Sequence, residues 1–241
     1  IADFLSSIIN RLSICILTVS KASKKEIANH TPLKNIKIIY NGIENKRLII
    51  PKKRKKNKKK IVLGMSGPID DHKGHNFIID VFSNLEKKSN KNIVLNIVGD
   101  GQKNYISFLK KKVIKKKLSK KIFFNGLFKK KINLFLNNID IYLMPTQTFE
   151  GFGYSMAEAM QNGLPVVASK VGAISEIVKN NKNGFVIIKN NYSQWTKIIL
   201  DLSNDYKKRI RIGLAANVTI NKKFNSLTMS NKYYNLFKNY L

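Results

Sequence analysis

The sequence predicts an α/β fold in which a parallel sheet is covered by helices on both faces. Six short apolar runs, separated by segments of helix length, follow one another from residue 61 onward. Each run is continuously apolar rather than alternating in polarity, which is typical of strands buried on both faces. Because ligands of such sheets bind at the carboxyl ends of the strands, the loops that follow these runs are the expected place of a functional site.

The predicted strands and helices follow in chain order. Two short strands come first, at Ser13–Ser20 and Ile36–Tyr40, and Ser20 is the expected cap of a helix between them. Lys52–Lys60 is rich in lysine and predicts a solvated linker at a domain boundary, with a dedicated binding tail as the alternative. The six strands of the sheet are expected at Ile61–Met65, Ile93–Val98, Ile122–Phe124, Ile139–Met144, Pro165–Ala168 and Phe185–Ile188. Ser193–Leu202 and a longer stretch to Leu241 then have a helical pattern.

Composition indicates a globular protein that attracts anions. The chain has 241 residues, 43% of them hydrophobic, and 45 Lys+Arg against 14 Asp+Glu give a net charge of +31. Such a charge draws in nucleotides, phosphosugars or acidic membranes. Nearly all of it is lysine, whereas the reading of base edges favours arginine, so nucleic acid is an unlikely partner. An A+T-rich genome would produce the same wealth of Lys, Asn and Ile.

Several kinds of site are excluded or disfavoured. The single cysteine, Cys15, excludes an internal disulfide and any multi-cysteine metal site. Gly99-Asp100-Gly101 lacks the third glycine of a dinucleotide fingerprint, and neither a Walker lysine loop nor a metal-binding histidine pattern occurs, so we expect no metal and no NAD. No run reaches the length of a membrane span. The chain opens at Ile1 within an apolar pattern and without a charged leader, so we expect that its N-terminus is missing.

The most informative stretch runs from Pro145 to Ser169. A strand ends at Met144, a loop carries Glu150, Gly151 and Gly153, and a helix is expected to begin near Ser155. Glycines let a backbone approach a ligand closely, and the amides at a helix start bind phosphate. Glu150 and Glu158 accompany this start on the same side, and carboxylates accept hydrogen bonds from sugar hydroxyls. The combination indicates a nucleoside diphosphate sugar.

A structural alternative competes with this interpretation. Ser155-Met156-Ala157-Glu158 is also a capping box, in which Glu158 would only satisfy the helix start. It leaves Glu150, the loop glycines and Phe152 unexplained, so we favour the functional interpretation. For Phe149 we expect a place in the core.

A second candidate loop, Gly67–His75, follows the first strand of the sheet. Lys73 in this loop stands where a lysine can neutralise a diphosphate, although a surface role is the alternative in so lysine-rich a chain. Gly99-Asp100-Gly101, after the next strand, is expected to be a turn required by backbone geometry.

These segments, in this order, resemble the donor half of the retaining glycosyltransferases of family 4, which have the GT-B fold of two facing Rossmann-like domains. Glu150 and Glu158 match the family's E-x7-E pattern within FEGFGYSMAEAMQNGLPVVAS. HKG at 72–74, VGDG at 98–101, FNG at 124–126, and SEIV followed by NGFVI near 175–187 are similar to further family segments. TVS at 18–20 and IIYNGIE at 38–44 resemble the family's crossing between its domains.

The resemblance implies a division of the chain and roles for its residues. Residues 1–20 would be the tail of an otherwise missing acceptor domain, 21–60 the crossing and linker, 61–222 the nucleotide-sugar-binding domain, and 223–241 a helix packing back towards the N-terminal domain. By the same resemblance Glu150, which would hold a donor-sugar hydroxyl, and Lys73, which would meet the diphosphate, are the catalytic residues. The implied donor-binding residues are Glu158 on the ribose hydroxyls, Leu127 against the nucleobase, and Gly67, Gly151, Phe152, Gly153, Tyr154 and Ser155 along the sugar and diphosphate.

The resemblance also implies an activity and partners. A sugar would pass with retention from a nucleotide sugar to a glycan or lipid-linked acceptor in cell-surface polysaccharide or lipopolysaccharide synthesis, without cofactor or metal. We expect a cytoplasmic protein with a peripheral contact to anionic membrane at its inner face. Pro68 departs from the family, which usually has an arginine at this position as a cationic clamp on the diphosphate. Substitution by nearby lysines is the alternative, although lysine lacks the bidentate geometry of arginine. The alternatives are an inactive remnant, a basic polyanion-binding module, or a sugar-nucleotide epimerase of similar architecture.

Overall fold

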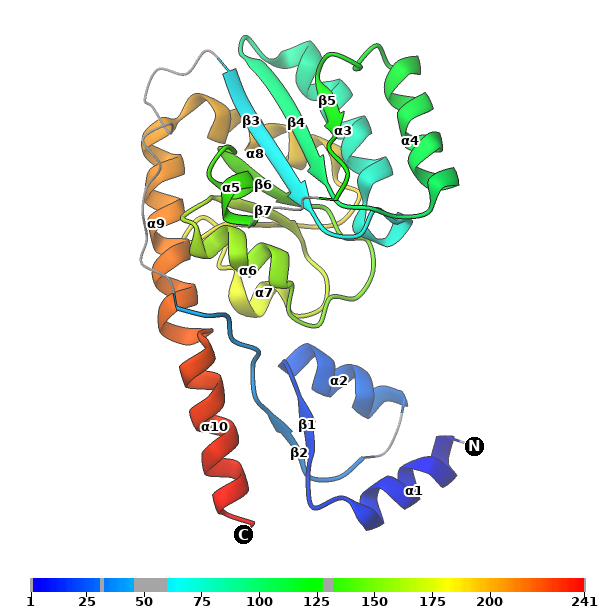
Figure 1. The fold of residues 1–241 in the computed structure, drawn as a ribbon, viewed down its shortest axis with the longest axis vertical. Helices are drawn as coiled ribbons and strands as arrows, with labels where there is room; N and C mark the ends of the chain where they lie inside the picture. The colour runs from blue at the N-terminus through cyan, green and yellow to red at the C-terminus, as the bar shows by residue number, and fades with distance from the viewer. Residues whose placement is uncertain (1, 31–32, 46–59, 128–131, 241) are drawn as a thin grey trace.

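The computed structural model describes residues 2–30, 33–45, 60–127 and 132–240. Most of the lysine-rich linker predicted at Lys52–Lys60 lies outside these ranges, and only Lys60, the first residue of a strand, is described. Within the described residues the chain forms a larger α/β unit and a smaller unit with a two-stranded sheet. Figure 1 shows the larger unit at the top and the smaller one below it.

The larger unit is built on a six-stranded parallel sheet, which confirms the predicted fold class. Its strands are β3 (Lys60–Ser66), β4 (Asn92–Val98), β5 (Ile122–Phe124), β6 (Ile141–Met144), β7 (Val166–Ser169) and β8 (Phe185–Ile187). Their order across the sheet is β5-β4-β3-β6-β7-β8. All six predicted strands are present, but β6 begins at Ile141 rather than at Ile139.

Helices connect these strands and cover both faces of the sheet. They are the 3-10 turn η1 (Asp71–Lys73), α3 (His75–Lys88), α4 (Lys103–Lys115), α5 (Ile132–Leu136), α6 (Tyr154–Gln161), α7 (Ile174–Ile177), α8 (Tyr192–Asn204) and α9 (Tyr206–Lys223). The side chains of α3, α4 and α8 pack on one face, and those of α5, α6 and α7 on the other. α9 contributes Ile212 to the first core cluster and Ala216 and Ile220 to the second.

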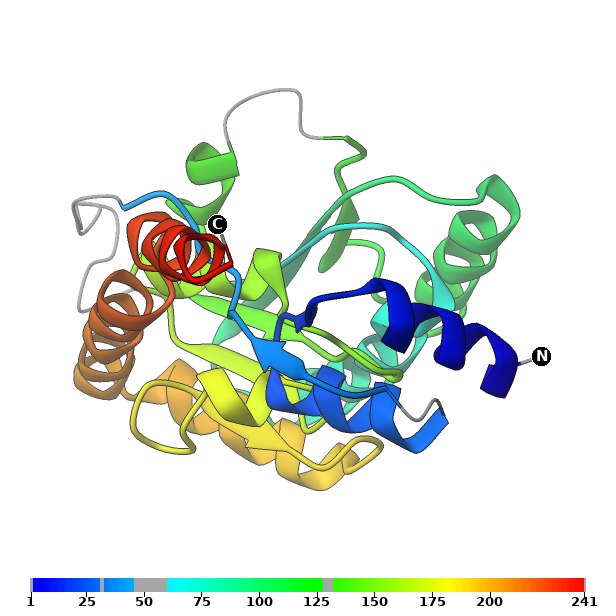
Figure 2. The same ribbon diagram turned by 90° about the horizontal axis from the view of Figure 1, so that it is seen from below.

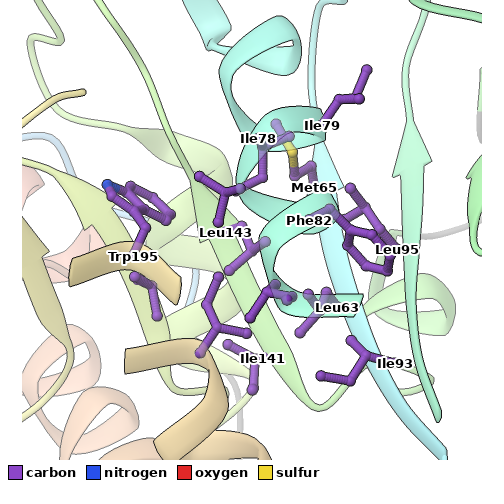
Figure 3. Close-up of a cluster of buried hydrophobic side chains, with 14 of the residues drawn as sticks. Leu63, Met65, Ile78, Ile79, Phe82, Ile93, Leu95, Ile141, Leu143 and Trp195 are labelled. Carbon is purple, nitrogen blue, oxygen red and sulfur yellow. The ribbon is translucent and has the colours of Figure 1, made fainter. Parts of the chain in front are cut away.

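The alternation of side chains along each strand explains why the runs are continuously apolar. Ile141 and Leu143 of β6 point into the core cluster under α3 and α8, which Figure 3 shows around Phe82 and Trp195. Tyr142 and Met144 of the same strand point into the opposite cluster. Because helices cover both faces, neither set of side chains meets water.

The smaller unit comprises α1 (Ala2–Leu12), β1 (Ile16–Thr18), α2 (Lys21–His30) and β2 (Ile36–Ile38). β1 and β2 pair in parallel, and Ser20 caps α2 as predicted, since its Oγ accepts the amide of Ser23 at 3.0 Å. In Figures 1 and 2 α1 and α10 lie on opposite sides of this small sheet.

The C-terminal stretch forms two helices, α9 and α10. α9 ends at Lys223, and α10 (Ser226–Lys238) begins after Asn225, whose side chain accepts the amide of Thr228. The backbone at this break pairs with the segment after β2: the Ile43 amide donates to the Phe224 carbonyl at 3.0 Å, and the Ser226 amide to the Ile43 carbonyl at 2.8 Å. Beyond it, Lys37 donates to the Tyr240 hydroxyl at 2.9 Å.

Candidate functional site

The order of the strands defines where a ligand site is expected. From β3 the chain proceeds to β4 and β5 on one side of the sheet, and then returns to place β6, β7 and β8 on the other. The carboxyl ends of the neighbours β3 and β6 therefore flank the point at which the winding reverses, which is where doubly wound sheets bind ligands. The loops after β3 and β6 are the two candidate loops of the sequence.

The loop after β3 turns sharply to present Lys73. Gly67 and Gly74 have φ values of +128° and +75°, which side-chain-bearing residues rarely adopt. Between them the Asp70 carboxylate caps η1 by accepting the amide of Lys73 at 2.9 Å. The amide of Gly74 then bonds the Asp71 carbonyl, and α3 begins at His75.

The loop after β6 lies directly against this turn. The Gln147 amide donates to the His72 carbonyl at 2.7 Å. A Cβ at Gly74 would lie 1.9 Å from the Pro145 carbonyl oxygen, so this close approach requires glycine. As a result, the Lys73 ammonium lies 2.9 Å from the Glu150 carboxylate, and the side chains are 34% and 17% exposed. The two predicted catalytic residues thus lie together in the structure.

The backbone of Glu150 is held from its other side by the turn after β7. The Ala173 amide donates to the Glu150 carbonyl at 2.8 Å. A Cβ at Gly172 would lie 2.1 Å from the same carbonyl oxygen. Glu150 is therefore fixed between two loops rather than standing on an open turn.

The start of α6 supports the functional interpretation of this stretch. The helix begins at Tyr154, one residue before the predicted start, and its N-cap is Gly153 with φ +85° and no side-chain cap. The capping-box alternative for Ser155 and Glu158 is therefore wrong, because Ser155 lies inside the first turn. Amides at such a start are suited to an anion.

A narrow pocket lies between the ends of β3 and β6 at this helix start. Its lining includes Ser66, Pro68, Lys73, His75, Tyr142, Thr146 and Ser155. Among the described residues that line it, Lys73 is the only lysine or arginine, so none of the other lining residues supplies the second cation that the resemblance implies. Pro68 itself is exposed at this pocket.

The buried hydroxyl groups that line this pocket were not predicted from the sequence. The buried hydroxyl of Tyr142 lies 3.0 Å from the Ser66 Oγ and also bonds the side chain of Ser155. Burial raises the pKa of Tyr142, with a smaller electrostatic contribution from Glu158. Ser155 and Glu158 thus both act on this hydroxyl from α6. A tyrosine inside an otherwise apolar strand was the available signal.

Two further polar side chains line the pocket. His75 is 3% exposed, and burial lowers its pKa, so the ring is held in the neutral form. Thr146 is also buried, and its Oγ1 has no hydrogen-bond partner among the described residues. Among the described residues no group of three or more His, Cys, Asp and Glu side chains is arranged to hold a metal ion.

The other predicted donor residues lie on either side of this pocket. Gly99 comes so close to Gly67 that a Cβ would lie 1.8 Å from the Gly67 carbonyl oxygen, in keeping with a turn set by backbone geometry. Its amide donates to the Gly126 carbonyl at 2.9 Å, so these three loops form a row along the sheet edge. Leu127 lies at the β5 end of this row, 66% exposed and outside the Lys73–Glu150 pair.

The two phenylalanines that flank Glu150 differ from each other. Phe152 is 2% exposed and packs near Tyr154 and Phe224. Phe149 is 46% exposed, so the expected core position is wrong. The Phe149 ring lies over Gly151, where a Cβ would approach it to 3.9 Å, on the surface of the loop rather than beneath it.

The fold and the place of its pocket define the class: this is a Rossmann-like domain of the kind found in GT-B glycosyltransferases. The family model for glycosyl transferases group 1 matches residues 46–218, and the chain belongs to this family. It is 24% identical to an uncharacterized 41.2 kDa protein in the cps region of Klebsiella pneumoniae, covering 98% of this chain and 64% of that protein.

Two further proteins carry names that describe an activity or a ligand. The poly(ribitol-phosphate) alpha-N-acetylglucosaminyltransferase of Staphylococcus aureus is 27% identical over 92% of this chain and 43% of its own length. Anabaena HepE, solved in complex with UDP and glucose, superposes with a TM-score of 0.86 at 23% identity over 98% of this chain and 66% of its own. The chain thus spans less than two thirds of these proteins.

No helix in the described part of the chain combines the length and the apolarity that crossing a membrane requires. The division of the chain at residues 20, 60 and 222 stays a prediction, as do the roles of the site residues.

Proposed function

We propose that the loops at the carboxyl ends of β3 and β6 bind a nucleotide-diphosphate sugar, and that the protein transfers the sugar to a glycan or lipid-linked acceptor with retention of its anomeric configuration. The observation that carries the proposal is the Lys73–Glu150 pair at 2.9 Å, placed at the switch point beside the uncapped start of α6. A cation and helix amides suit a diphosphate, and a carboxylate suits a sugar hydroxyl.

Each side chain has a distinct part in this proposal. Lys73 and the amides from Phe152 to Ser155 stabilise the negative charge that develops on the leaving diphosphate. Glu150 accepts a hydrogen bond from a hydroxyl of the donor sugar and orients it. Glu158 holds the ribose hydroxyls, and Leu127 lies against the base. Gly67, where an added Cβ would meet nothing within 4 Å, leaves room for the ligand, and the backbone of Gly151 lies along the sugar. Such a site stabilises the leaving group without a metal ion or cofactor.

The relatives favour a uridine nucleotide and a cell-surface product. HepE was solved with UDP and glucose, and the staphylococcal relative is named for transfer of N-acetylglucosamine to poly(ribitol phosphate). We therefore propose a UDP-sugar as donor and a cell-surface polysaccharide, lipopolysaccharide or related polymer as product. Because nucleotide sugars are made in the cytoplasm, we place the protein there.

A basic surface on α4 supports a contact with anionic membrane. Residues 101–139 contain twelve lysines and no carboxylate side chain. On α4 the exposed Lys110, Lys111 and Lys115 surround Phe108 and Ile114, which are 49% and 66% exposed. Apolar side chains among cations suit the interface of an anionic bilayer.

Vesicle sedimentation tests this contact. We expect the chain to sediment with vesicles that contain phosphatidylglycerol and not with neutral ones at low salt. Replacing Lys110, Lys111 and Lys115 together by Gln should weaken this binding more than the same change at the exposed Lys197, Lys207 and Lys232. Equal losses from the two triple variants would show that only net charge matters.

The donor site is tested by calorimetric titration with UDP-, GDP- and ADP-sugars. We expect saturable binding of the uridine class, weakened at least about tenfold by Glu158→Ala. Asp201→Ala, which removes a carboxylate on α8 that pairs with Lys208, is the matched control and should bind as the unchanged chain does. A folded chain that binds none of these sugars but binds polyanions in a salt-sensitive way would favour the inactive remnant or polyanion-binding module.

A further inference from the structure

The carboxylate of Glu176 joins the N-terminal segment to the larger sheet. Glu176 lies on α7, after β7, yet its partners come from residues more than 130 positions away in the sequence. Its Oε2 accepts the amide of Lys21 at 3.0 Å, and its Oε1 accepts the amide of Ala22 at 2.8 Å. The hydroxyl of Tyr40, just after β2, donates to Oε2 at 2.5 Å.

These contacts satisfy the exposed amides at the start of α2. The first amides of a helix have no partner within it, and at α2 the Ser20 hydroxyl accepts that of Ser23. Glu176 accepts the two before it with a charged group, which is the stronger kind of hydrogen bond and also matches the positive end of the helix dipole. Burial together with the bond to Glu176 raises the pKa of Tyr40 to about 12.

A short chain of backbone bonds leads from Glu176 to Glu150. The amide of Glu176 donates to the Ala173 carbonyl at 2.9 Å, and the amide of Ala173 donates to the Glu150 carbonyl at 2.8 Å. One end of this small turn is therefore fixed to the loop of the donor site. The other end is fixed, through the Glu176 carboxylate, to α2.

The corner between β1 and α2 also touches the site loop directly. A Cβ at Gly151 would lie 3.5 Å from both the Ser23 Oγ and the Val19 Cγ2. Gly151 therefore faces this corner at van der Waals distance, next to Glu150. Any movement of α2 away from α7 would open the space on which the site loop rests.

We propose that Glu176 is a positioning residue of the donor site, which holds the corner at Val19–Ser23 against the loop of Glu150 and so fixes the placement of the Glu150 carboxylate. This inference rests on the proposed donor function of that loop. Glu176 does not touch the donor itself. Its effect passes through Ala173 on one side and through the packing of α2 on the other.

Hydrogen–deuterium exchange of the full chain tests the coupling without any ligand. In Glu176→Gln we expect faster exchange at Lys21 and Ala22, and also in the loop 149–153. Glu176→Asp should restore part of the protection, and Tyr40→Phe, which removes one of the three bonds, should have a smaller effect. Asp201→Asn is the control and should leave both segments unchanged. Faster exchange at α2 with an unchanged site loop would overturn the proposal, since Glu176 would then only cap a helix.

Donor titration with the same variants gives the second measurement. We expect Glu176→Gln to weaken binding of the UDP-sugar about five- to tenfold and to leave binding of UDP alone within about twofold, because a small misplacement of Glu150 affects only its sugar contact. Equal weakening of both ligands would contradict the proposal. If the unchanged chain binds no nucleotide sugar, the proposed function fails, whereas the exchange of loop 149–153 still decides whether Glu176 positions it.

Discussion

The ammonium of Lys73 and a carboxylate oxygen of Glu150 lie 2.9 Å apart, although 77 positions separate the residues in the sequence. The pair spans the point at which the sheet reverses its winding. Before a ligand arrives, each charge offsets the other. In the proposed donor site, a bound diphosphate would therefore compete with Glu150 for Lys73, while a bound sugar would engage the carboxylate.

This competition predicts opposite effects for two ligands. Glu150→Gln removes the charge that holds Lys73, so UDP alone should bind about two- to fivefold more tightly, in line with the modest worth of a partly exposed pair. The UDP-sugar should bind more weakly, because an amide is a poorer acceptor for its hydroxyl. Calorimetric titration of both ligands measures the two changes.

Lys73→Met is the matched variant, since it removes the cation and keeps much of the side-chain length. It should weaken UDP and the UDP-sugar alike. If Glu150→Gln weakened both ligands equally, Glu150 would serve the loop structure rather than the sugar.

Substitutions at two glycines distinguish the cost of a steric clash from the cost of a left-handed backbone conformation. Gly74 and Gly126 have similar φ values, +75° and +65°, but only at Gly74 would a Cβ collide, 1.9 Å from the Pro145 carbonyl oxygen. Gly126→Ala should cost about 1 kcal/mol of unfolding free energy, the ordinary penalty of this conformation. Gly74→Ala should cost at least about 2 kcal/mol more, because the loops after β3 and β6 must separate.

Urea denaturation measures these free energies, and donor titration adds a functional measurement. Gly74→Ala should also weaken donor binding, because Lys73 and Glu150 move apart with their loops. Equal destabilisation by the two variants would show that the contact with Pro145 relaxes at little cost.

The larger sheet could be predicted because burial on both faces leaves a local signal. Each strand, such as Ile61–Met65, had to be apolar on both faces whichever strands it pairs with. A continuous apolar run in the sequence was therefore enough to predict it. The same reasoning located the loops of Lys73 and Glu150 at carboxyl ends of strands. That neighbouring strands would place these two loops in contact depends on the sheet order, which no local pattern contains.

Phe149 and Glu176 show where sequence reasoning ends. Phe149 stands between Thr148 and Glu150 in a loop. An aromatic residue there has the same local pattern whether it points inward or lies over a glycine, so only the path of the loop exposes Phe149. The amides that Glu176 binds belong to a helix far away in the sequence. Because only the tertiary fold brings Glu176 to these amides, no spacing in the sequence indicates the contact. The start of α6 was predicted one residue late, because Ser155 fits the first position of a capping box.

A substitution at position 68 is expected to strengthen nucleotide binding. Pro68 is exposed at the pocket that Lys73 lines, at a position where the family resemblance implies an arginine. Pro68→Arg would add a planar cation that binds phosphate oxygens in pairs, so UDP should bind about three- to tenfold more tightly. The added contact should also make binding more sensitive to salt.

Calorimetry at two salt concentrations measures both effects. Pro68→Gln is the control, because it removes the proline ring without adding charge. An arginine variant no better than the glutamine variant would show that the pocket does not bring a diphosphate within reach of position 68.

His75 predicts a dependence of stability on pH. Burial is the main cause that holds the pKa of its ring below the ordinary value of 6.5. The unfolded chain therefore binds a proton at this residue more readily than the folded chain does. It follows that the stabilising contribution is complete above about pH 6.5 and is lost as the pH falls from there towards the lower pKa of the folded state.

Urea denaturation at pH 5, 6 and 7 tests this dependence. One proton sets a limit of about 1.4 kcal/mol per pH unit on the slope that His75 contributes. His75→Gln should lower stability at pH 7, because it disturbs a buried site, but it should flatten the slope between pH 5 and 7. The exposed His72 is the control, and His72→Gln should keep the full slope. If the slope survives in His75→Gln, another group is responsible, and the ring at the pocket does not stay neutral for the reason given.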